Sequence, residues 1–395
     1  IRSMFAAAMP VVPHIAKLHA EMTAWRQDLH AHPEIAFEET RTADFVAAKL
    51  GEFGIEVHRG LARTGVVGRL VNGNGPAIGL RADMDALPIA EINEFAHRSV
   101  NTGTMHACGH DGHTTMLLGA ARYLAEARAF QGTVHFIFQP AEENEGGGRV
   151  MVEEGLFETF ACDRVFGMHN WPGMAVGEFA IGAGPMMASA DNFEITVQGR
   201  GSHAAMPHLG IDPVFIGAEI VTALQSISSR ATDAVDAVIV SVTQFHGGDA
   251  WNVIPDSVRL RGTVRAFRAE IRDRAEAAIG RIASGIAEAH GGSAEYSYIR
   301  RYPATVNHAD EVEMAAAAAS DVVGAKNVDR APQPCMGSED FSFMLQARPG
   351  AYIWIGNGAS DGGRTLHNAR YDFNDEILPI GASYWARLAE TLLAG

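Results

Sequence analysis

The sequence predicts an α/β protein in which a mostly parallel sheet flanked by helices is interrupted by a smaller, inserted α+β domain. Short apolar strands alternate with amphipathic helices in the first and last parts of the chain, whereas the middle follows a different order. The length of 395 residues also exceeds the size at which one hydrophobic core keeps growing. We therefore expect a discontinuous first domain, residues 1–187 and 301–395, and an inserted domain, residues 188–300.

The outer parts of the chain carry the alternating pattern. In the first part we expect helices at Thr40–Leu50 and Thr114–Ala127 and strands at Ala77–Arg81 and Thr133–Gln139. After residue 301 the pattern predicts helix Glu311–Val323, strand Ala351–Gly356 and helix Asp375–Leu393.

The middle of the chain predicts the order β-α-β-β-α-β of a ferredoxin-like sandwich. The expected elements are strand Phe193–Val197, helix Pro213–Arg230, strands Ala237–Phe245 and Ser257–Ala266, helix Glu270–His290 and strand Ala294–Ile299. Such a segment of roughly a hundred residues is long enough for a core of its own.

Composition restricts the class of partner. A formal net charge of -16, from 31 Lys and Arg against 47 Asp and Glu, disfavours nucleic acid and anionic membrane surfaces. Hydrophobic residues at 47% and charged residues at 20% are ordinary for a globular enzyme. The chain has no apolar run long enough to span a membrane.

Residues 1–16 resemble a leader only weakly, because Pro10 and Pro13 interrupt the apolar stretch. We interpret Ile1 as an expression remnant before a start at Met4. Three cysteines are too few for a disulfide framework, so we expect a reduced, cytoplasmic protein.

The first polar cluster is Arg81–Pro88, where Asp83 and Asp85 follow a predicted strand. Alternate side chains of a strand share a face, and neighbouring carboxylates repel unless a cation, proton or imidazole lies near them. The alternative is a turn with a solvated Asp-x-Asp pair.

A second cluster lies in Met105–His113, which holds three histidines, Cys108 and Asp111 before a predicted helix. Imidazole and thiolate groups are borderline-soft metal ligands, and the glycines of this segment would let them converge from a loop. Structural zinc is a weaker alternative because paired Cys-x-x-Cys spacings are missing, and a group of surface histidines is another.

The third cluster is Gln139–Glu145, in which Glu142 and Glu143 follow an apolar strand. One carboxylate could bind a metal ion while its neighbour serves as a general base for water. A Glu-Glu pair is also common at helix N-termini. His169 and His367 are dispersed, and each taken alone is more often a satisfied core or loop histidine.

Together these residues resemble the M20 metallopeptidase family, in particular its amidohydrolase branch with hippurate hydrolases and plant hydrolases of indole-acetyl amino acids. The resemblance runs from about Trp25 to the C-terminus. It rests on five motifs: Asp83–Pro88, Cys108–His113, Gln139–Glu143, Gly201–Ala205 and Gly337–Phe341.

The resemblance implies two divalent ions per chain, zinc or manganese with cobalt or nickel as possible substitutes. It assigns the ions to Cys108, His110, Glu143, His169 and His367. It also implies that Glu142 is the general base for a metal-activated water and that Asp85 orients a ligand. The peptidases of the family carry His where this chain has Asp83, which favours the amidohydrolases and puts Asp83 in doubt as a ligand.

For the inserted domain the resemblance implies a lid and a dimerisation surface, giving a homodimer or homotetramer. His203 would stabilise the oxyanion of the tetrahedral intermediate, and Asn252 would contact substrate, although a simple turn is an equal interpretation of Asn252. The function expected is hydrolysis of small N-acyl amino acids to a carboxylic acid and an amino acid. The alternatives are an exopeptidase of the same family and a metal-binding or sensor protein without catalysis.

Overall fold

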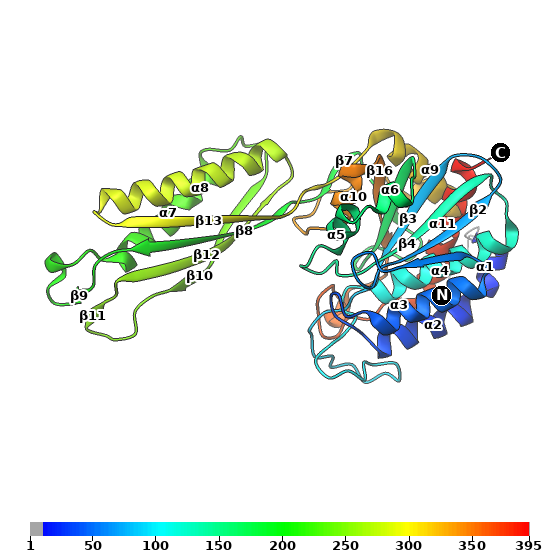
Figure 1. Cartoon of the computed structure of the whole chain (residues 1–395), viewed down its shortest axis with the longest axis horizontal. Coiled ribbons are helices and arrows are strands. Elements are labelled where there is room, and N and C mark those ends of the chain that lie inside the picture. Colours follow the sequence, from blue (N-terminus) through cyan, green and yellow to red (C-terminus); the bar gives the residue numbers. More distant parts are fainter. Residues whose placement is uncertain (1–10, 395) are drawn as a thin grey trace, which may run out of the picture. The chain divides into compact units, whose positions relative to one another are not determined.

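The computed structural model describes residues 11–394, so the part of the leader pattern that includes Met4 and Pro10 lies outside the described residues. The chain divides into two compact units (Figure 1). Unit 1 comprises the chain up to Met186, Val306–Gln333 and the chain from Asp340 onward. Unit 2 comprises Met187–Thr305 and Pro334–Glu339.

Unit 1 is built on a mixed sheet whose strands follow the order β1-β2-β4-β3-β5-β16-β6-β15. Their bounds are β1 Glu56–Arg59, β2 Val66–Asn72, β3 Ala77–Asp83, β4 Gly132–Gln139, β5 Arg164–Trp171, β6 Phe179–Ala180, β15 Val328–Asp329 and β16 Gly350–Gly356. The central strands β4, β3, β5 and β16 run parallel, whereas β1, β2 and the β16–β6 pair are antiparallel. The expected large, mostly parallel sheet is confirmed.

Helices cover both faces of this sheet. They are α1 Pro13–Lys17, α2 His19–Ala31, α3 Thr40–Glu52, α4 His110–Ala127, α5 Gly147–Glu153, α6 Leu156–Thr159, α9 Ala309–Val323, α10 Phe341–Ala347 and α11 Leu378–Leu392, with short 3-10 turns at Ala325–Asn327, Asp361–Gly363 and Asp375–Ile377. Ile353 of β16 shares one buried core with Trp385 of α11, whereas its neighbour Tyr352 packs against Phe341 of α10. Consecutive strand residues face opposite sides, so α10 and α11 lie on opposite faces.

Two helices begin three or more residues away from the sequence expectation. Helix α4 starts at His110 rather than Thr114, because Gly109 adopts φ 99° and turns the chain into the helix there. Helix α11 starts at Leu378 rather than Asp375, because the side chain of Asn374 accepts a hydrogen bond from Glu376 N–H and closes a 3-10 turn first.

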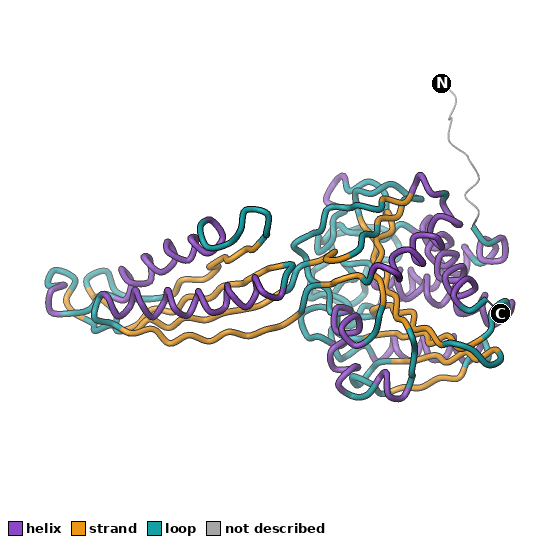
Figure 2. Tube along the Cα trace, turned by 90° about the horizontal axis from the view of Figure 1, so that it is seen from above, coloured by secondary structure: helices purple, strands orange, loops and turns teal. Residues whose placement is uncertain are grey.

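Unit 2 has its own four-stranded antiparallel sheet in the order β10-β12-β8-β13, with two long helices running along the strands (Figure 2). Along the chain its elements are β8 Ala190–Gln198, β9 Ser202–His203, a 3-10 turn Pro207–Leu209, α7 Pro213–Ser229, β10 Val238–His246, β11 Val253–Ile254, β12 Ser257–Ala266, α8 Ala269–Ala289 and β13 Ser293–Tyr302. Helix α7 begins where Asp212 accepts hydrogen bonds from Val214 and Phe215 N–H, with Pro213 at its first position. Alternate residues of β8, such as Phe193, Ile195 and Val197, form a core with the inner faces of both helices.

The chain leaves unit 1 through β7, Gly184–Met187, and returns through β14, Thr305–Asn307. These two strands pair with each other. Within residues 11–394, no helix is long and apolar enough to cross a membrane.

Candidate metal centre

The site residues expected in unit 1 follow the ends of neighbouring strands. Strand β3 ends at Asp83, which lies opposite Gln139, the last residue of the parallel strand β4. Glu142 and Glu143 lie three and four residues after the end of β4, and His169 lies near the end of β5 on the other side of β3. The carboxyl ends of parallel strands meet at one edge of a sheet, where ligands bind in folds of this type.

Cys108, His110 and His169 converge at this edge. The Cys108 Sγ atom lies 3.3 Å from His169 Nε2, and one donor atom from each of the three side chains lies within 4.8 Å of the others. Burial, followed by the nearby Glu143 carboxylate, raises the pKa of the Cys108 thiol well above its ordinary value. A bound cation would reverse this balance, since a coordinating thiol is deprotonated.

His110 is held with one ring nitrogen occupied and the other turned into the donor group. Its Nδ1 lies 2.8 Å from the Asp85 carbonyl oxygen and 3.2 Å from Asp85 Oδ1, as expected for an N–H donor. Its Nε2 is fully buried and has no hydrogen-bond partner among the described residues, and Asp83 Oδ2 lies 3.7 Å from it. Burial lowers the pKa of His110, but Asp83 and Asp85 outweigh it and raise the pKa to about 10. An orphaned, buried imidazole nitrogen facing a thiol and carboxylates is what a metal ligand needs.

Glu142 and Glu143 complete the group from the segment after β4. The backbone N–H of Glu143 donates to Asp85 Oδ2 at 2.9 Å, so Asp85 fixes both this segment and His110. Glu143 Oε1 lies 3.0 Å from His367 Nε2. The Glu142 side chain is 7% exposed and offers an oxygen within 4.8 Å of donors on His110 and Glu143.

Five groups of donors among the described residues have their donor atoms within 4.8 Å of one another, and three of these groups consist of the expected ligands and base. They are Cys108, His110 and His169; His110, Glu142 and Glu143; and Cys108, Glu143 and His367. All five expected metal ligands and the expected base therefore lie in one cluster. Thiolate, imidazole and carboxylate donors in such a cluster suit divalent transition metals, so the residues present fit metal binding.

Asp83 is engaged by other side chains. Its Oδ1 accepts a hydrogen bond from His113 Nδ1–H at 2.6 Å, and its Oδ2 lies 2.8 Å from Arg81 Nη1. Burial would raise the pKa of Asp83, but His110, His113 and Arg81 together lower it well below the ordinary value. His113 Nε2 accepts from Asn170 N–H at 2.9 Å, so both nitrogens of this histidine are occupied. These hydrogen bonds of Asp83 and His113 connect β3, α4 and β5 next to the candidate donors.

A buried ion pair between Arg81 and Asp340, which the sequence pattern did not predict, stabilises the same edge of the sheet. Arg81 Nη2 donates to Asp340 Oδ1 at 2.9 Å, and Asp340 also accepts from Gln139 Nε2 and, at 2.7 Å, from Gly148 N–H. Asp340 lies in Gly337–Phe341, a motif of the family resemblance. Its pairing with a residue 259 positions away carries no local signal.

His106 and Asp111, which share the histidine-rich segment, stay outside the donor groups. Neither ring nitrogen of His106 has a hydrogen-bond partner in the described part of the chain, and burial lowers the pKa of His106 to about 4. Asp111 Oδ2 lies 2.8 Å from His30 Nδ1, and Arg26 lies nearby at 3.7 Å. Burial lowers the pKa of His30, but hydrogen bonds to Asp111 and Glu91 outweigh it and raise the pKa to about 9.

His203 and Asn252 lie in unit 2, next to each other. Strand β9 pairs with β11 so that His203 lies opposite Val253, and Ala204 N–H donates to the Asn252 carbonyl oxygen at 2.9 Å. Both side chains are exposed. His203 Nδ1 accepts from Ala205 N–H at 3.1 Å, which leaves Nε2 as the nitrogen that carries a proton in the neutral ring.

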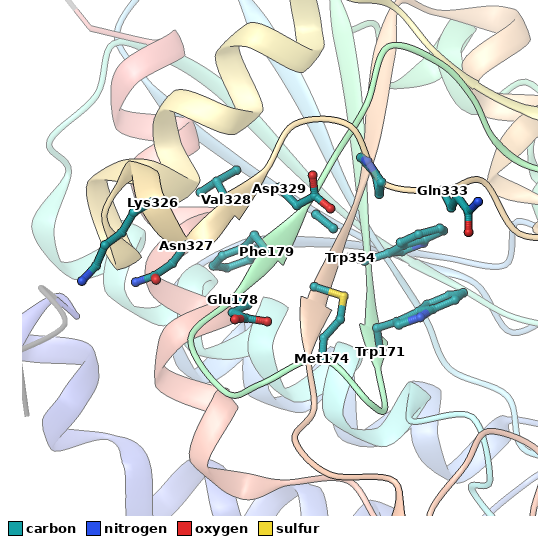
Figure 3. A pocket seen from close by; sticks show the side chains of 12 residues that line it. Trp171, Met174, Glu178, Phe179, Lys326, Asn327, Val328, Asp329, Gln333 and Trp354 are labelled. Atoms are coloured by element: carbon teal, nitrogen blue, oxygen red, sulfur yellow. The ribbon is translucent and has the colours of Figure 1, made fainter. Parts of the chain in front are cut away.

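A cavity of about 440 Å³ opens in unit 1 beside the end of β5 (Figure 3). Trp171 and Trp354 stack with ring centroids 4.0 Å apart and form one wall, and Met174 lies beside them. Glu178, Asn327, Asp329 and other polar residues line the remainder. The ring of Trp171 is 6.3 Å from the ring of His169, so the aromatic wall adjoins the metal centre.

Residues 79–391 match the sequence profile of peptidase family M20/M25/M40. A hippurate hydrolase from Campylobacter jejuni is 43% identical over 96% of this chain and 99% of its own length. A thermostable carboxypeptidase from Saccharolobus solfataricus is 38% identical over 93% of both chains. A crystal structure from Bacillus subtilis, described as a dinuclear metal-binding peptidase of the M20 family, aligns with a TM-score of 0.84. That structure is 34% identical, and the alignment covers 96% of this chain and 99% of the other.

Proposed function

Because the chain belongs to peptidase family M20/M25/M40, we propose that it is a metal-dependent amidohydrolase that cleaves N-acyl amino acids to a carboxylic acid and an amino acid. The observation that carries this proposal is the Glu142 carboxylate beside the Cys108, His110 and His169 donor group. A protein that only stored or sensed metal would not need an additional carboxylate next to its ligands.

We assign the metal centre to two divalent ions held by Cys108, His110, Glu143, His169 and His367. Zinc suits the thiolate best, and manganese, cobalt and nickel are accepted by mixed nitrogen and oxygen donors. When bound, such ions supply Lewis-acid polarisation of the amide carbonyl and a lowered pKa for an attacking water.

The chain's own residues then handle the proton. Glu142 takes the proton of the attacking water at its carboxylate and returns it to the leaving amine nitrogen, which becomes the amino group of the product. Asp85 keeps the His110 ring turned so that Nε2, not Nδ1, faces the donor group. We further assign His203, through Nε2–H, to the developing oxyanion and Asn252 to substrate contact, with unit 2 acting as the lid.

The cavity lined by Trp171, whose ring lies 6.3 Å from the ring of His169, supports an aromatic acyl group as the preferred substituent. A benzoyl ring stacks favourably on an indole face, and Trp171 adjoins both the cavity and the metal ligand. N-benzoylglycine, which is hippurate, is therefore the first substrate to assay.

Carboxypeptidase activity on unblocked peptides is the second candidate function, since a carboxypeptidase is among the relatives. The experiment measures amino-acid release from N-benzoylglycine, N-acetylglycine and unblocked dipeptides, with zinc, manganese or cobalt and with a chelator. We expect release from the acylated substrates that depends on metal. Release confined to unblocked dipeptides would establish the peptidase instead, and no release from any substrate would contradict both.

We also propose a cytoplasmic homodimer or homotetramer assembled through unit 2. The three cysteines Cys108, Cys162 and Cys335, all within the described residues, are free thiols, as a reducing compartment maintains them. Light scattering during size-exclusion chromatography tests the assembly, and a variant lacking unit 2 would be monomeric.

A further inference from the structure

The segment that carries Glu142 has an unusual backbone. Ala141, the residue before Glu142, adopts φ 56°, a left-handed conformation that residues with a side chain rarely adopt. Its carbonyl accepts from Gly147 N–H at 2.8 Å, which closes the turn from β4 to α5. Such a conformation persists only when its surroundings hold it in place.

The carboxylate of Glu39, more than a hundred residues earlier in the chain, stabilises this conformation by a hydrogen bond. Glu39 Oε1 accepts a hydrogen bond from Ala141 N–H at 2.8 Å, and the Glu39 side chain is completely buried. The same oxygen accepts from Phe37 N–H at 3.0 Å, and Glu39 Oε2 accepts from the Thr64 hydroxyl at 2.6 Å. Phe37 at φ 62° is itself left-handed, as is Arg63 at φ 68° next to Thr64. The Glu39 carboxylate therefore accepts hydrogen bonds from three turns, each of which contains a residue with a left-handed backbone.

Glu39 stands at the N-terminus of α3, yet its carboxylate makes no capping hydrogen bond to that helix among the described residues. Glu34 caps α3 instead, accepting from Arg41 N–H at 3.0 Å and from Thr42 N–H at 2.8 Å. The helix therefore does not explain why a carboxylate is buried at position 39. Burial, followed by the charge of Asp85, raises the pKa of Glu39 to about 7, so this placement opposes ionisation.

We infer that Glu39 is a positioning residue for the general base: it fixes Ala141 in the left-handed conformation from which Glu142 reaches the metal centre. The inference rests on the proposed function, in which Glu142 handles the proton. The Glu39 carboxylate accepts hydrogen bonds from Phe37, Thr64 and Ala141 and not from a candidate metal donor, so it acts through the backbone of Ala141.

The central experiment compares Glu39→Ala with Glu34→Ala. Glu34 and Glu39 both lie near the start of α3, and the carboxylate of each accepts hydrogen bonds from two backbone N–H groups. Only Glu39 accepts one from Ala141, the residue before Glu142. With kcat, KM, metal content and thermal midpoint measured on the metal-loaded enzyme, Glu39→Ala should lower kcat by about tenfold or more with KM nearly unchanged. Glu34→Ala should lower the midpoint but leave kcat within about twofold. Equal kcat values for the two variants at matched metal content would overturn the inference.

Rescue by an isosteric side chain separates positioning from loss of charge. In Glu39→Gln the amide oxygen still accepts from Ala141 and Phe37, and the amide nitrogen can donate to Thr64, so kcat should stay within about threefold of wild type. A kcat as low as that of Glu39→Ala would rule out positioning through hydrogen bonds. If Glu39→Ala does not fold, Glu39→Asp, which is one methylene shorter, takes its place with the same expected loss.

A double-mutant cycle then tests whether the effect passes through residue 141. Glycine adopts φ 56° without strain, so Glu39→Ala should lose clearly less kcat in an Ala141→Gly background than alone. Equal losses in both backgrounds would contradict action through Ala141. Failure of the proposed function is distinguishable, because it would appear as a metal-loaded wild-type enzyme that releases no amino acid from any substrate.

Discussion

The turn between Cys108 and His110 allows a quantitative test of how the metal centre is held. Gly109 adopts φ 99°, and a Cβ atom there would lie 2.5 Å from Tyr371 Oη and closer still to Asn170 Nδ2. The left-handed backbone costs a residue with a side chain about 1–2 kcal/mol. Forcing an extra carbon into a packed site costs about 1–3 kcal/mol more. Gly109→Ala should therefore lower the free energy of unfolding by about 2–5 kcal/mol.

Gly103→Ala is the matched control. Gly103 has a similar φ of 85°, but a Cβ atom there would meet nothing within 4 Å, so only the backbone cost of about 1–2 kcal/mol applies. Urea unfolding of both variants gives the difference, and elemental analysis gives the metal content. Gly109→Ala should also bind less metal, since Cys108 and His110 flank the shifted residue. If Gly109→Ala matches Gly103→Ala in stability and keeps its full metal content, our account of this turn is wrong.

Four further predictions concern the chemistry and its support. Glu142→Gln should lower turnover of N-benzoylglycine by about a hundredfold or more while metal content stays unchanged, and unimpaired turnover would remove Glu142 from the base role. His203→Ala should lower kcat more than it raises KM, whereas an effect on KM alone would argue against an oxyanion contact. Trp171→Ala should lower kcat/KM about tenfold for N-benzoylglycine but little for N-acetylglycine, and equal losses would place the acyl group elsewhere. The pKa of His30 beside Asp111 rises from 6.5 to about 9 on folding, so its contribution to stability is complete below pH 6.5 and disappears as pH rises through 9. Urea unfolding should therefore show a larger stability difference between wild type and His30→Gln at about pH 6 than above pH 9, and a difference independent of pH would refute this.

The sequence pattern was sufficient for the large sheet and, together with the family resemblance, for naming candidate donor residues that lie close together in the structure. Strand ends such as Asp83 and Gln139 are visible as apolar runs that stop at polar residues, and parallel strands place those ends at one edge. It did not reveal that His110 begins a helix, because the turn depends on the left-handed Gly109 fitting beside Asn170.

Some contacts between distant segments, away from the strand ends, have no signal in the local sequence. Glu39 reads locally as one more acidic residue before a helix, and only the folded chain places it against Ala141. The stacking of Trp171 on Trp354 likewise joins strands 183 positions apart, which hydrophobic periodicity cannot anticipate. The segment Pro334–Glu339, which belongs to unit 2 although its neighbours belong to unit 1, has no compositional boundary that marks it.

The pairing of β7 with β14 has a consequence for how this molecule can change over evolutionary time. The chain leaves unit 1 on β7 and returns to it on β14, and these two strands are hydrogen-bonded to each other. The insertion Met187–Thr305 is therefore joined to unit 1 at both of its ends by this strand pair, and its length is not constrained by the spacing of the strands in unit 1. Such a module can be lengthened, shortened or replaced while Cys108, Glu142 and His169 keep their places. Selection can then change unit 2 without rebuilding the candidate metal centre of unit 1.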